Sequence, residues 1–453
     1  MITAPPILDA RGASVPLGRI AGWGRSPVVE GREIVSEDLV RSTRFASLTR
    51  GLGRSYGDAS LPSSSERLVA GSRLADRILA FDPSTGLLRA EAGLSLHALN
   101  RLLLTRGWFT PVTPGTQFVT LGGMVAADVH GKNHHSAGTF GRHLEALRLR
   151  TGSGEILDVG ADSEPELFRA TQGGMGLTGH ILEVAVRMQR VPSPWILAGV
   201  ETAPDIETLV ERLRAAGREW PYTVAWADFL RDDGRGILVK GRWATPDEAG
   251  IRAFEWPGSV GVPFDMPNWV LGGPLMRVFN RAYYLANGID ARTAIVHPQP
   301  FFYPLDAVRD WNRVYGRRGM TQYQCVLPSA CGAEAFRTLI RIARSHDSSP
   351  YLVVVKDFGV EGEGLLSFPR PGITFTLDFP VSERTTQRLV DALNDFVAST
   401  GGRIYLAKDA FTRAEHFRAM EPRLAEFAAV RDRWDPERTI RSAQSVRLFG
   451  DAA

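Results

Sequence analysis

Three histidines, a lysine and an asparagine stand among three glycines in the stretch HGKNHHSAGTFG, which runs from His130 to Gly141. Side chains of these types can bind a metal, transfer protons or line a ligand site. His130 and His134 have the spacing of a zinc pair, but only a helix brings that spacing onto one face. Gly131 and Gly138 disfavour a helix, and the stretch contains no carboxylate. We therefore predict a loop that lies against a ligand, and no metal site.

Glycine-rich segments recur in the first half of the chain. They are RGLGRSYGD (Arg50–Asp58), TPGTQFVTLGG (Thr113–Gly123) and GGMGLTG (Gly173–Gly179). Backbone N–H groups in such loops can surround an anion, and several loops together suit a cofactor with a pyrophosphate. The alternative is a set of tight turns. The Gly-Lys-Ser/Thr ending of a P-loop and a clean G-x-G-x-x-G are both absent, so neither a P-loop nor a Rossmann site is indicated.

Length and charge narrow the class of protein. The chain of 453 residues is too long to fold around a single hydrophobic core. At about 150 residues per domain, we expect two or three domains. Lys+Arg number 53 against 50 Asp+Glu, and no basic block indicates a nucleic-acid partner. Cys325 and Cys331 make neither a disulfide framework nor a zinc site. The N-terminus lacks a signal-peptide pattern, and no apolar run approaches the ~18 residues of a membrane span. We expect a cytoplasmic protein with at most peripheral membrane contact.

The elements that must position these loops are mixed strands and helices. Residues 77–93 and 144–160 each predict two strands around a turn, and 180–188 predict a buried strand. A helix is expected from an N-cap at Ser95 to Gly107. Its expected apolar face consists of Leu96, Leu99, Leu102 and Leu103.

The second half of the chain begins after a Pro-rich boundary at residues 190–195. Residues 383–400 predict a helix between strand-like runs at 223–230, 235–243, 322–328, 351–359 and 372–380. Hairpins and an antiparallel second sheet predict an α+β fold rather than a doubly wound parallel sheet.

Several of these stretches together resemble the vanillyl-alcohol-oxidase superfamily of FAD enzymes over nearly the whole chain. The stretches are TRGLGRSYGDAS, TPGTQFVTLGGMVAADVHGKNHH, GGMGLTG, YLAKD and VRDRWDPERTIRS. Within the superfamily, the match is close to the flavoproteins that oxidise C2 of a polyprenylphosphoryl ribose. The resemblance implies a PCMH-type FAD-binding domain of residues 1–191 and 404–453. A substrate-binding domain on an antiparallel sheet would span residues 192–403.

The resemblance also implies site residues. It places Lys408, His130, Lys132 and Tyr56 where flavin and substrate meet. The implied FAD contacts are Gly51, Gly53, Arg54, Ser55, Tyr56, Gly57, Gly115, Thr116, Thr120, Gly122, Gly123, Ala127, His130, Ile181 and Tyr405. Related enzymes often link the flavin covalently through a histidine of the first glycine loop. Asp58 stands at that position here, so we predict non-covalent FAD.

Oxidation of an alcohol by a flavin moves a hydride to the flavin and a proton to a base. Lys408 is the first candidate, as a base of lowered pKa or as a cation that stabilises an alkoxide; the alternative is a solvated strand lysine. Lys356 and Lys132 can bind a phosphate. Gln322 and Gln324 share one strand face and can bind sugar hydroxyls, or can simply face solvent. Trp311 and Thr376 complete the expected substrate site.

Four positions depart from the related mycobacterial enzymes. Thr374 and Thr376 replace an active-site asparagine and cysteine, and Phe302-Tyr303 replace a Tyr-His pair. The expected function is nonetheless oxidation of a lipid-linked or small sugar, with a short-chain-type reductase as partner for the 2-keto product. Two alternatives stay open: an FAD oxidase of a soluble polyol, aldonolactone or secondary-metabolite alcohol, and a non-catalytic FAD-binding scaffold.

Overall fold

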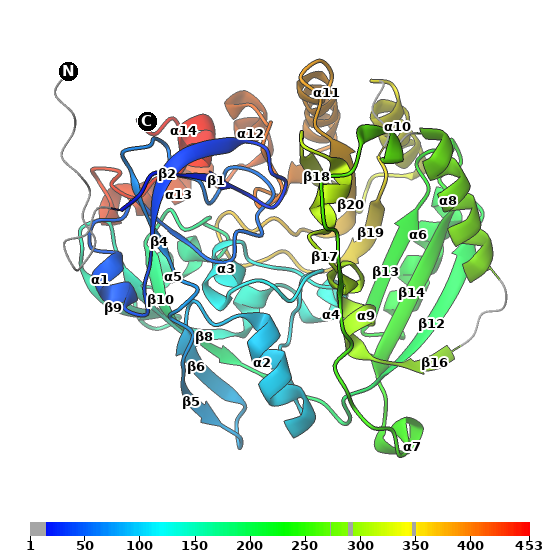
Figure 1. Ribbon diagram of the computed structural model, residues 1–453, viewed down its shortest axis with the longest axis horizontal. Helices are drawn as coiled ribbons and strands as arrows, with labels where there is room; N and C mark the ends of the chain where they lie inside the picture. Colours follow the sequence, from blue (N-terminus) through cyan, green and yellow to red (C-terminus); the bar gives the residue numbers. More distant parts are fainter. Residues whose placement is uncertain (1–14, 272, 289–292, 347–349) are drawn as a thin grey trace.

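The computed structural model describes residues 15–271, 273–288, 293–346 and 350–453. Two small sheets and their helices form one side of the molecule in Figure 1, and a large sheet with its helices forms the other. The fold is α+β, as predicted. No helix in the described residues has the length and apolar character needed to cross a membrane.

The first side is built from two sheets. One sheet has the order β1-β2-β4-β3, with strands Gly18–Ala21, Val28–Val35, Leu68–Gly71 and Leu48–Arg50. The other has the order β5-β6-β10-β8-β9, with strands Ile78–Asp82, Leu87–Glu91, His180–Arg187, Leu144–Arg150 and Ile156–Gly160. The second sheet is antiparallel throughout, which confirms both predicted hairpins and the predicted strand.

Short helices and turns connect these strands to the site. They are α1 (Leu39–Ser42), α2 (Leu96–Leu103), η1 (Leu104–Arg106), α3 (Leu121–Ala126), α4 (His134–Ala137), η2 (Phe140–His143) and α5 (Pro165–Thr171), with a small ribbon of β7 (Trp108–Phe109) and β11 (Gln189–Arg190).

Helix α2 begins after Ser95, whose side chain accepts the N–H of Ala98, as predicted. Leu102 was wrongly expected in its buried face: it is 43% exposed. Leu102 lies on the solvent-facing side of the helix, whereas the side chains of Leu99 and Leu103 pack in the core.

The large sheet is an eight-stranded antiparallel sheet with the order β16-β12-β14-β13-β19-β20-β18-β21. Its strands are Thr293–Val296, Ile196–Ala203, Gly236–Trp243, Tyr222–Ala227, Val353–Phe358, Gly372–Pro380, Met320–Pro328 and Arg403–Ile404. Helices α6 (Ile206–Gly217), α10 (Ala333–Arg344) and α11 (Thr386–Ser399) contact it and one another. Because side chains alternate along a strand, the sheet can bury one face under these helices and turn the other toward a cavity.

The remaining elements border or close that cavity. Between β14 and β18 lie α7 (Pro246–Ala249), β15 (Val260–Gly261), η3 (Asn268–Leu271), α8 (Gly273–Asn287), α9 (Pro298–Phe302), η4 (Pro304–Ala307), β17 (Val308–Arg309) and η5 (Trp311–Tyr315). After β21 come α12 (Ala414–Met420), α13 (Leu424–Trp434) and α14 (Ala443–Phe449), which lie beside the N-terminal sheets in Figure 1.

Candidate active site

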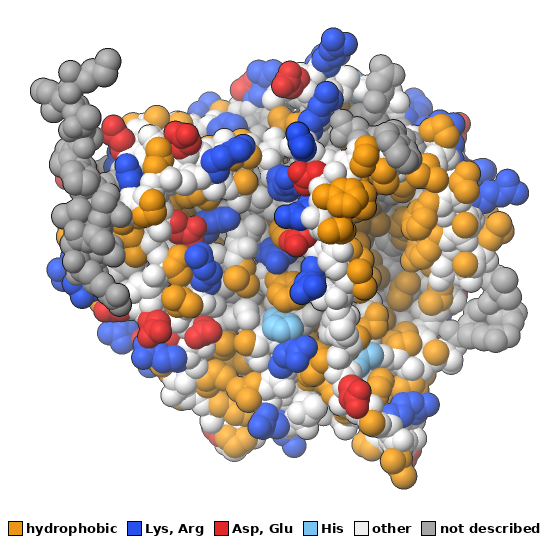
Figure 2. All heavy atoms as spheres, in the orientation of Figure 1, with side chains coloured by type: hydrophobic (Ala, Val, Ile, Leu, Met, Phe, Trp, Pro, Cys, Tyr) orange, Lys and Arg blue, Asp and Glu red, His pale blue; other side chains and the backbone are white. Residues whose placement is uncertain are grey.

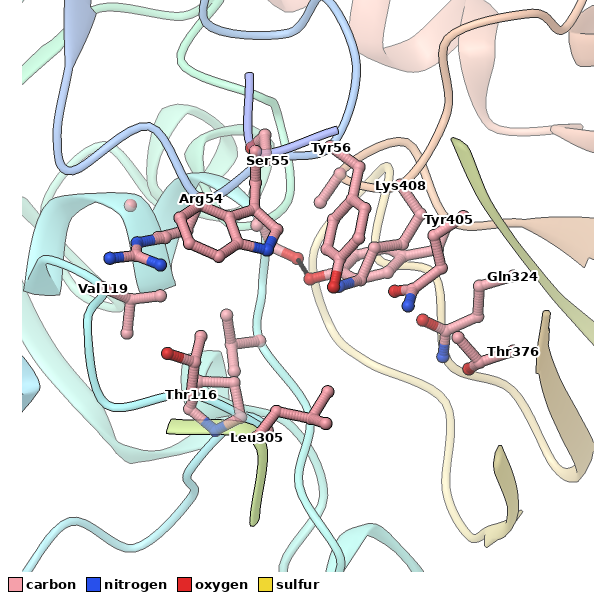
Figure 3. A pocket seen from close by; sticks show the side chains of 18 of the residues that line it. Arg54, Ser55, Tyr56, Thr116, Val119, Leu305, Gln324, Thr376, Tyr405 and Lys408 are labelled. Carbon is pink, nitrogen blue, oxygen red and sulfur yellow. Dashed lines mark hydrogen bonds between the residues drawn. The ribbon is translucent and has the colours of Figure 1, made fainter. Parts of the chain in front are cut away.

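A cavity of about 900 Å³ lies between the glycine loops and the open face of the large sheet. Arg54, Thr116 and Val119 lie at one end in Figure 3, and Lys408, Gln324 and Thr376 at the other. Every residue predicted to act on the substrate lines this one cavity: Tyr56, His130, Lys132, Trp311, Gln322, Gln324, Lys356, Thr376 and Lys408. The fold therefore brings together side chains that are more than 350 positions apart in the sequence.

The predicted cofactor residues also meet here, with one exception. The lining includes Gly51, Gly53, Arg54, Ser55, Gly115, Thr116, Thr120, Gly122, Gly123, Ala127, Ile181 and Tyr405. Gly57 was expected in this set and does not line the cavity. A side chain at Gly57 would collide with the backbone carbonyl of Asp409. That glycine is needed for the close packing of two loops, not for contact with a ligand.

The glycine loops leave backbone exposed to the cavity. At Gly115 and Gly176 a Cβ atom would meet no other atom within 4 Å, so a side chain there would project into open space. Gly53 adopts a φ of 64°, which favours glycine. Nearby, the Arg54 guanidinium stacks 3.9 Å above the Trp23 ring, and its Nε has no hydrogen-bond partner among the described residues. Exposed backbone beside a half-buried guanidinium whose Nε is still free to donate fits a pyrophosphate.

Electrostatics at the other end depend on lysine. The chain contains four lysines, and three of them, Lys132, Lys356 and Lys408, line the cavity. Burial and, to a smaller extent, the charge of Lys356 lower the pKa of Lys132 and of Lys408 to about 7. Burial also lowers the pKa of Lys356, to about 8. Arginine stays charged at any such pH, whereas these amines can lose a proton near neutrality.

Two of these lysines are held by defined contacts. Lys408 Nζ lies 4.0 Å from the centre of the Tyr56 ring, and Lys132 Nζ donates to the Phe302 carbonyl at 3.1 Å. The backbone carbonyl of Lys132 accepts the Thr223 N–H, so the histidine stretch is fixed against the large sheet. The amines are thereby positioned before any ligand enters.

His130 is a neutral imidazole packed in an aromatic cage. The Gln324 amide bonds to its Nε2 at 3.0 Å, and Phe358, Tyr405 and Phe368 lie within 6 Å of its ring centre. Burial first, then the nearby lysines, hold the pKa of His130 well below its usual value. Its Nδ1 has no hydrogen-bond partner among the described residues. Because Gln324 Nε2 can only donate, Nε2 of His130 accepts that bond and Nδ1 carries the proton of the neutral ring, so Nδ1 can donate but cannot accept.

The other histidines of the stretch hold the loop. His134 and His135 belong to the single turn α4, although the sequence disfavoured a helix there. Nδ1 of His134 accepts the Gly359 N–H, and Nε2 of His135 bonds to the Trp220 carbonyl. Among the described residues no group of three His, Cys, Asp or Glu side chains is placed to hold a metal.

Asp378 lies two residues after Thr376 on β20 and therefore shares its strand face. It is fully buried, accepts bonds from Gln322 Nε2 and, at 3.5 Å, from the Tyr315 hydroxyl, and raises the pKa of Lys408. Burial raises the pKa of Asp378 itself to about 7. Alternate residues of a strand point to the same face, so the sequence pattern Thr374, Thr376, Asp378 could have indicated that Asp378 lies with the site residues.

Neighbouring threonines divide into two roles. Thr376 lines the cavity, whereas Thr374 is fully buried and donates to the Cys325 carbonyl. Thr374 also accepts a bond from the Gln324 amide. It therefore orients Gln324 from behind rather than forming the wall.

Asp58 is turned away from the cavity. Both of its carboxylate oxygens accept hydrogen bonds from Arg447 of α14, at 2.7 and 2.8 Å, and it does not line the cavity. The ion pair fixes the first glycine loop to the C-terminal helices.

Comparison with known proteins adds an independent set of findings. The FAD binding domain family matches residues 37–160, which include the first two glycine loops and the histidine stretch. A decaprenylphosphoryl-β-D-ribose oxidase of Mycolicibacterium smegmatis is 34% identical over 95% of this chain and 97% of its own. An uncharacterised protein of Streptomyces coelicolor is 34% identical over 78% of this chain and 100% of its own. A putative D-arabinono-1,4-lactone oxidase of Neurospora crassa is 28% identical over only 33% of this chain and 26% of its own.

Proposed function

The chain belongs to the decaprenylphosphoryl-β-D-ribose oxidase family of FAD-dependent oxidoreductases, and from this we propose that it oxidises C2 of a polyprenylphosphoryl-β-D-ribose to the 2-keto sugar. The observation that carries the proposal is the concentration of three of the four lysines at one cavity beside the glycine loops. An alcohol oxidase needs a base for the hydroxyl proton, which a neutral lysine amine can supply, and a phosphate-bearing substrate needs a cation, which a charged lysine can supply.

FAD, when bound, supplies the acceptor for the hydride that leaves the carbinol carbon. Backbone of the three glycine loops, with Arg54, would hold its phosphates. Tyr56, His130 and Tyr405 would lie against the remainder of the cofactor. We further propose that residues 1–191 and 404–453 form the FAD-binding domain and that 192–403 form the substrate-binding domain.

Lys408 has the proton-transfer role. With a pKa of about 7 it is substantially neutral at physiological pH, and the neutral amine can accept the hydroxyl proton. The ammonium that results is stabilised by the carboxyl of Asp378 and by the face of Tyr56. In its charged form the same group would stabilise an alkoxide.

Lys132 and Lys356 bind the sugar phosphate. Their amines are half-buried and open to the cavity. The phosphodiester of the incoming substrate carries one negative charge, which favours the protonated form of each amine, so binding itself raises their pKa. Gln322, Gln324 and Trp311 would contact the sugar ring, and Thr376 would form part of its wall.

Neither alternative function is favoured. The lactone-oxidase relatives match a minor part of the chain, whereas the decaprenylphosphoryl-ribose oxidase matches nearly all of it. A non-catalytic scaffold would not require three amines of lowered pKa at the FAD cavity. The 2-keto product calls for a reductase that consumes it, and we propose a short-chain-type enzyme as that partner.

Anaerobic flavin bleaching tests the function. Purified protein is mixed with a short-chain prenylphosphoryl ribose, the arabinose epimer, D-arabinono-1,4-lactone and ribose 5-phosphate. We expect bleaching with the prenylphosphoryl ribose and little with the others. Faster bleaching by the lactone would replace the proposed function with the soluble-substrate alternative. Acid precipitation of the same sample should release all flavin into the supernatant, because the Asp58 carboxylate is bound to Arg447 and cannot form the histidyl link.

A further inference from the structure

Helix α8 presents an apolar stripe to solvent. Leu275, Val278 and Leu285 are 49, 66 and 55% exposed, and exposed Ala282 lies between them at the spacing of one helix face. Figure 2 shows hydrophobic side chains gathered at the position of α8 in Figure 1, beside a hollow in the surface. Contiguous apolar surface of this kind marks a site of association.

A neighbouring face of the same helix walls the proposed active site. Met276, Phe279 and Tyr283 line the cavity, and Asn280 fastens the helix by a hydrogen bond to Asp228. The apolar stripe and the cavity wall therefore lie on neighbouring faces of one helix, along the same turns.

A second apolar edge borders the cavity. The β15–β17 ribbon and the loop after it expose Val260 (74%), Phe264 (60%) and Val308 (38%), and Val308 also lines the cavity. Exposed hydrophobic side chains thus stand on two elements that border one opening. A single extended hydrophobic phase could cover both at once.

The charges on helix α8 have one sign. Residues 266–288 contain Arg277 and Arg281 and no carboxylate, and both arginines are exposed. In the second edge, Arg309 of β17 is exposed beside the exposed Asp310, and Arg317 is exposed in the loop after η5. Arginine beside an apolar helix face matches the interface of a bilayer that contains anionic lipid, where each cation near the surface adds to binding.

We propose that α8 and the β15–β17 ribbon dock on the surface of an anionic lipid bilayer and hold the cavity mouth against it. The inference rests on the proposed function only for the reason that docking would be useful, which is delivery of a lipid-linked substrate. A substrate with a polyprenyl anchor could then slide from the membrane into the cavity without its hydrocarbon crossing water. The docking itself requires only the exposed side chains described above.

Vesicle flotation tests the docking. The probe is the FAD-loaded full chain with vesicles of phosphatidylcholine and phosphatidylglycerol in equal parts, or of phosphatidylcholine alone. We expect the protein to float with the anionic vesicles and more weakly with the neutral ones. Val278→Glu combined with Leu285→Glu should weaken vesicle binding by about tenfold or more, since both apolar side chains are then lost to the interface.

Val360→Glu is the matched control, because Val360 lies after β19, outside the cavity lining, and is also 66% exposed. It should float like the wild type. A wild-type protein that stays with neither vesicle, or an α8 double variant that floats normally, would overturn the proposal. Sedimentation velocity adds a further outcome: a wild-type dimer that the double variant dissociates would show that a second copy covers α8, which also overturns it.

Activity on a detergent-dispersed short-chain substrate separates this proposal from the proposed function. All three proteins should bleach at the same rate there, since Val278, Leu285 and Val360 lie outside the cavity lining. Failure of every protein to bleach would reject the substrate and leave the flotation result standing.

Discussion

Lys408 is the residue on which the chemistry most depends. Lys408→Met keeps the length of the side chain but removes the amine, so FAD should stay bound while flavin reduction falls by about 10²–10⁴-fold. Lys240→Met is the control, because Lys240 is the fourth lysine of the chain and pairs with Glu201 outside the cavity. Stopped-flow reduction near neutral pH measures both. Near-normal reduction by Lys408→Met would remove this lysine from the mechanism.

Asp378 tunes that lysine. Its carboxyl raises the pKa of Lys408, so Asp378→Asn should lower that pKa. The base is active when neutral, and the rate therefore rises with pH through the pKa of Lys408. Removal of the carboxylate should shift this rising limb to lower pH. A purely structural Asp378 would change the height of the pH profile but not its midpoint.

Thr376 decides how the pocket meets reactive inhibitors. Nitroaromatic inhibitors of the mycobacterial enzymes are reduced by the flavin and captured by the cysteine at this position. A threonine hydroxyl is a weak nucleophile without an activating base. We expect no adduct on the wild-type chain and one adduct on Thr376→Cys, by intact-protein mass spectrometry after turnover. Thr374→Cys is the control: Thr374 is fully buried behind the wall and should stay unlabelled.

The glycine loop and the C-terminal helix α14 are coupled by Arg447. Its guanidinium bonds Asp58 at 2.7 Å and Asp409 at 2.9 Å, and both carboxylates are buried. Arg447→Met leaves two carboxylates without their cation, so the free energy of unfolding should fall by about 3–5 kcal/mol. Arg413→Met breaks an exposed pair with Asp391 and should cost about 1 kcal/mol or less. Urea titration measures both. The deficit of Arg447→Met should shrink as pH falls, because burial raises the pKa of Asp58 and protonation of that carboxylate removes one of the two uncompensated charges.

At the scale of elements, the alternation of apolar and polar residues and the residue types at turns were enough to predict secondary structure from the sequence. Residues 77–93 and 144–160 are hairpins because alternation and Gly-containing turns both specify them. The turn at His134–Ala137 was missed because its stabilisation is tertiary: hydrogen bonds from Gly359 and to Trp220 hold its histidines. Gly57 was misassigned for a similar reason. Its neighbour Asp409 lies some 350 positions away in sequence, which no local pattern shows.

At the scale of the molecule, the cavity exists because distant segments are tied together. Tyr303, from the turn after α9, bonds through its hydroxyl to Thr113 at 2.5 Å and to Asn100 at 2.9 Å. Asp306 of η4 binds Thr116 and the N–H of Gln117. These bonds anchor the loop that carries Gly115. The resemblance to known flavoproteins indicated which residues meet, but it did not indicate this clamp, since Phe302-Tyr303 differ from the related enzymes.

Tyr303→Phe therefore tests whether the clamp serves the cofactor as well as stability. Loss of the hydroxyl leaves Asn100 and Thr113 short of a buried partner, which should lower the free energy of unfolding by about 1–3 kcal/mol. Tyr323→Phe should cost a similar amount, because the buried Tyr323 hydroxyl bonds Asn394 of α11 within the large-sheet side.

FAD distinguishes the two variants. Ligand at about a hundred times its Kd stabilises a protein by about 2.7 kcal/mol. If the clamp preorganises the Gly115 loop, Tyr303→Phe binds FAD more weakly and gains less at the same FAD concentration, whereas Tyr323→Phe gains the full amount. Thermal denaturation of the apoproteins with and without FAD provides the measurement. Equal gains for the two variants would show that Tyr303 stabilises the fold without shaping the FAD site.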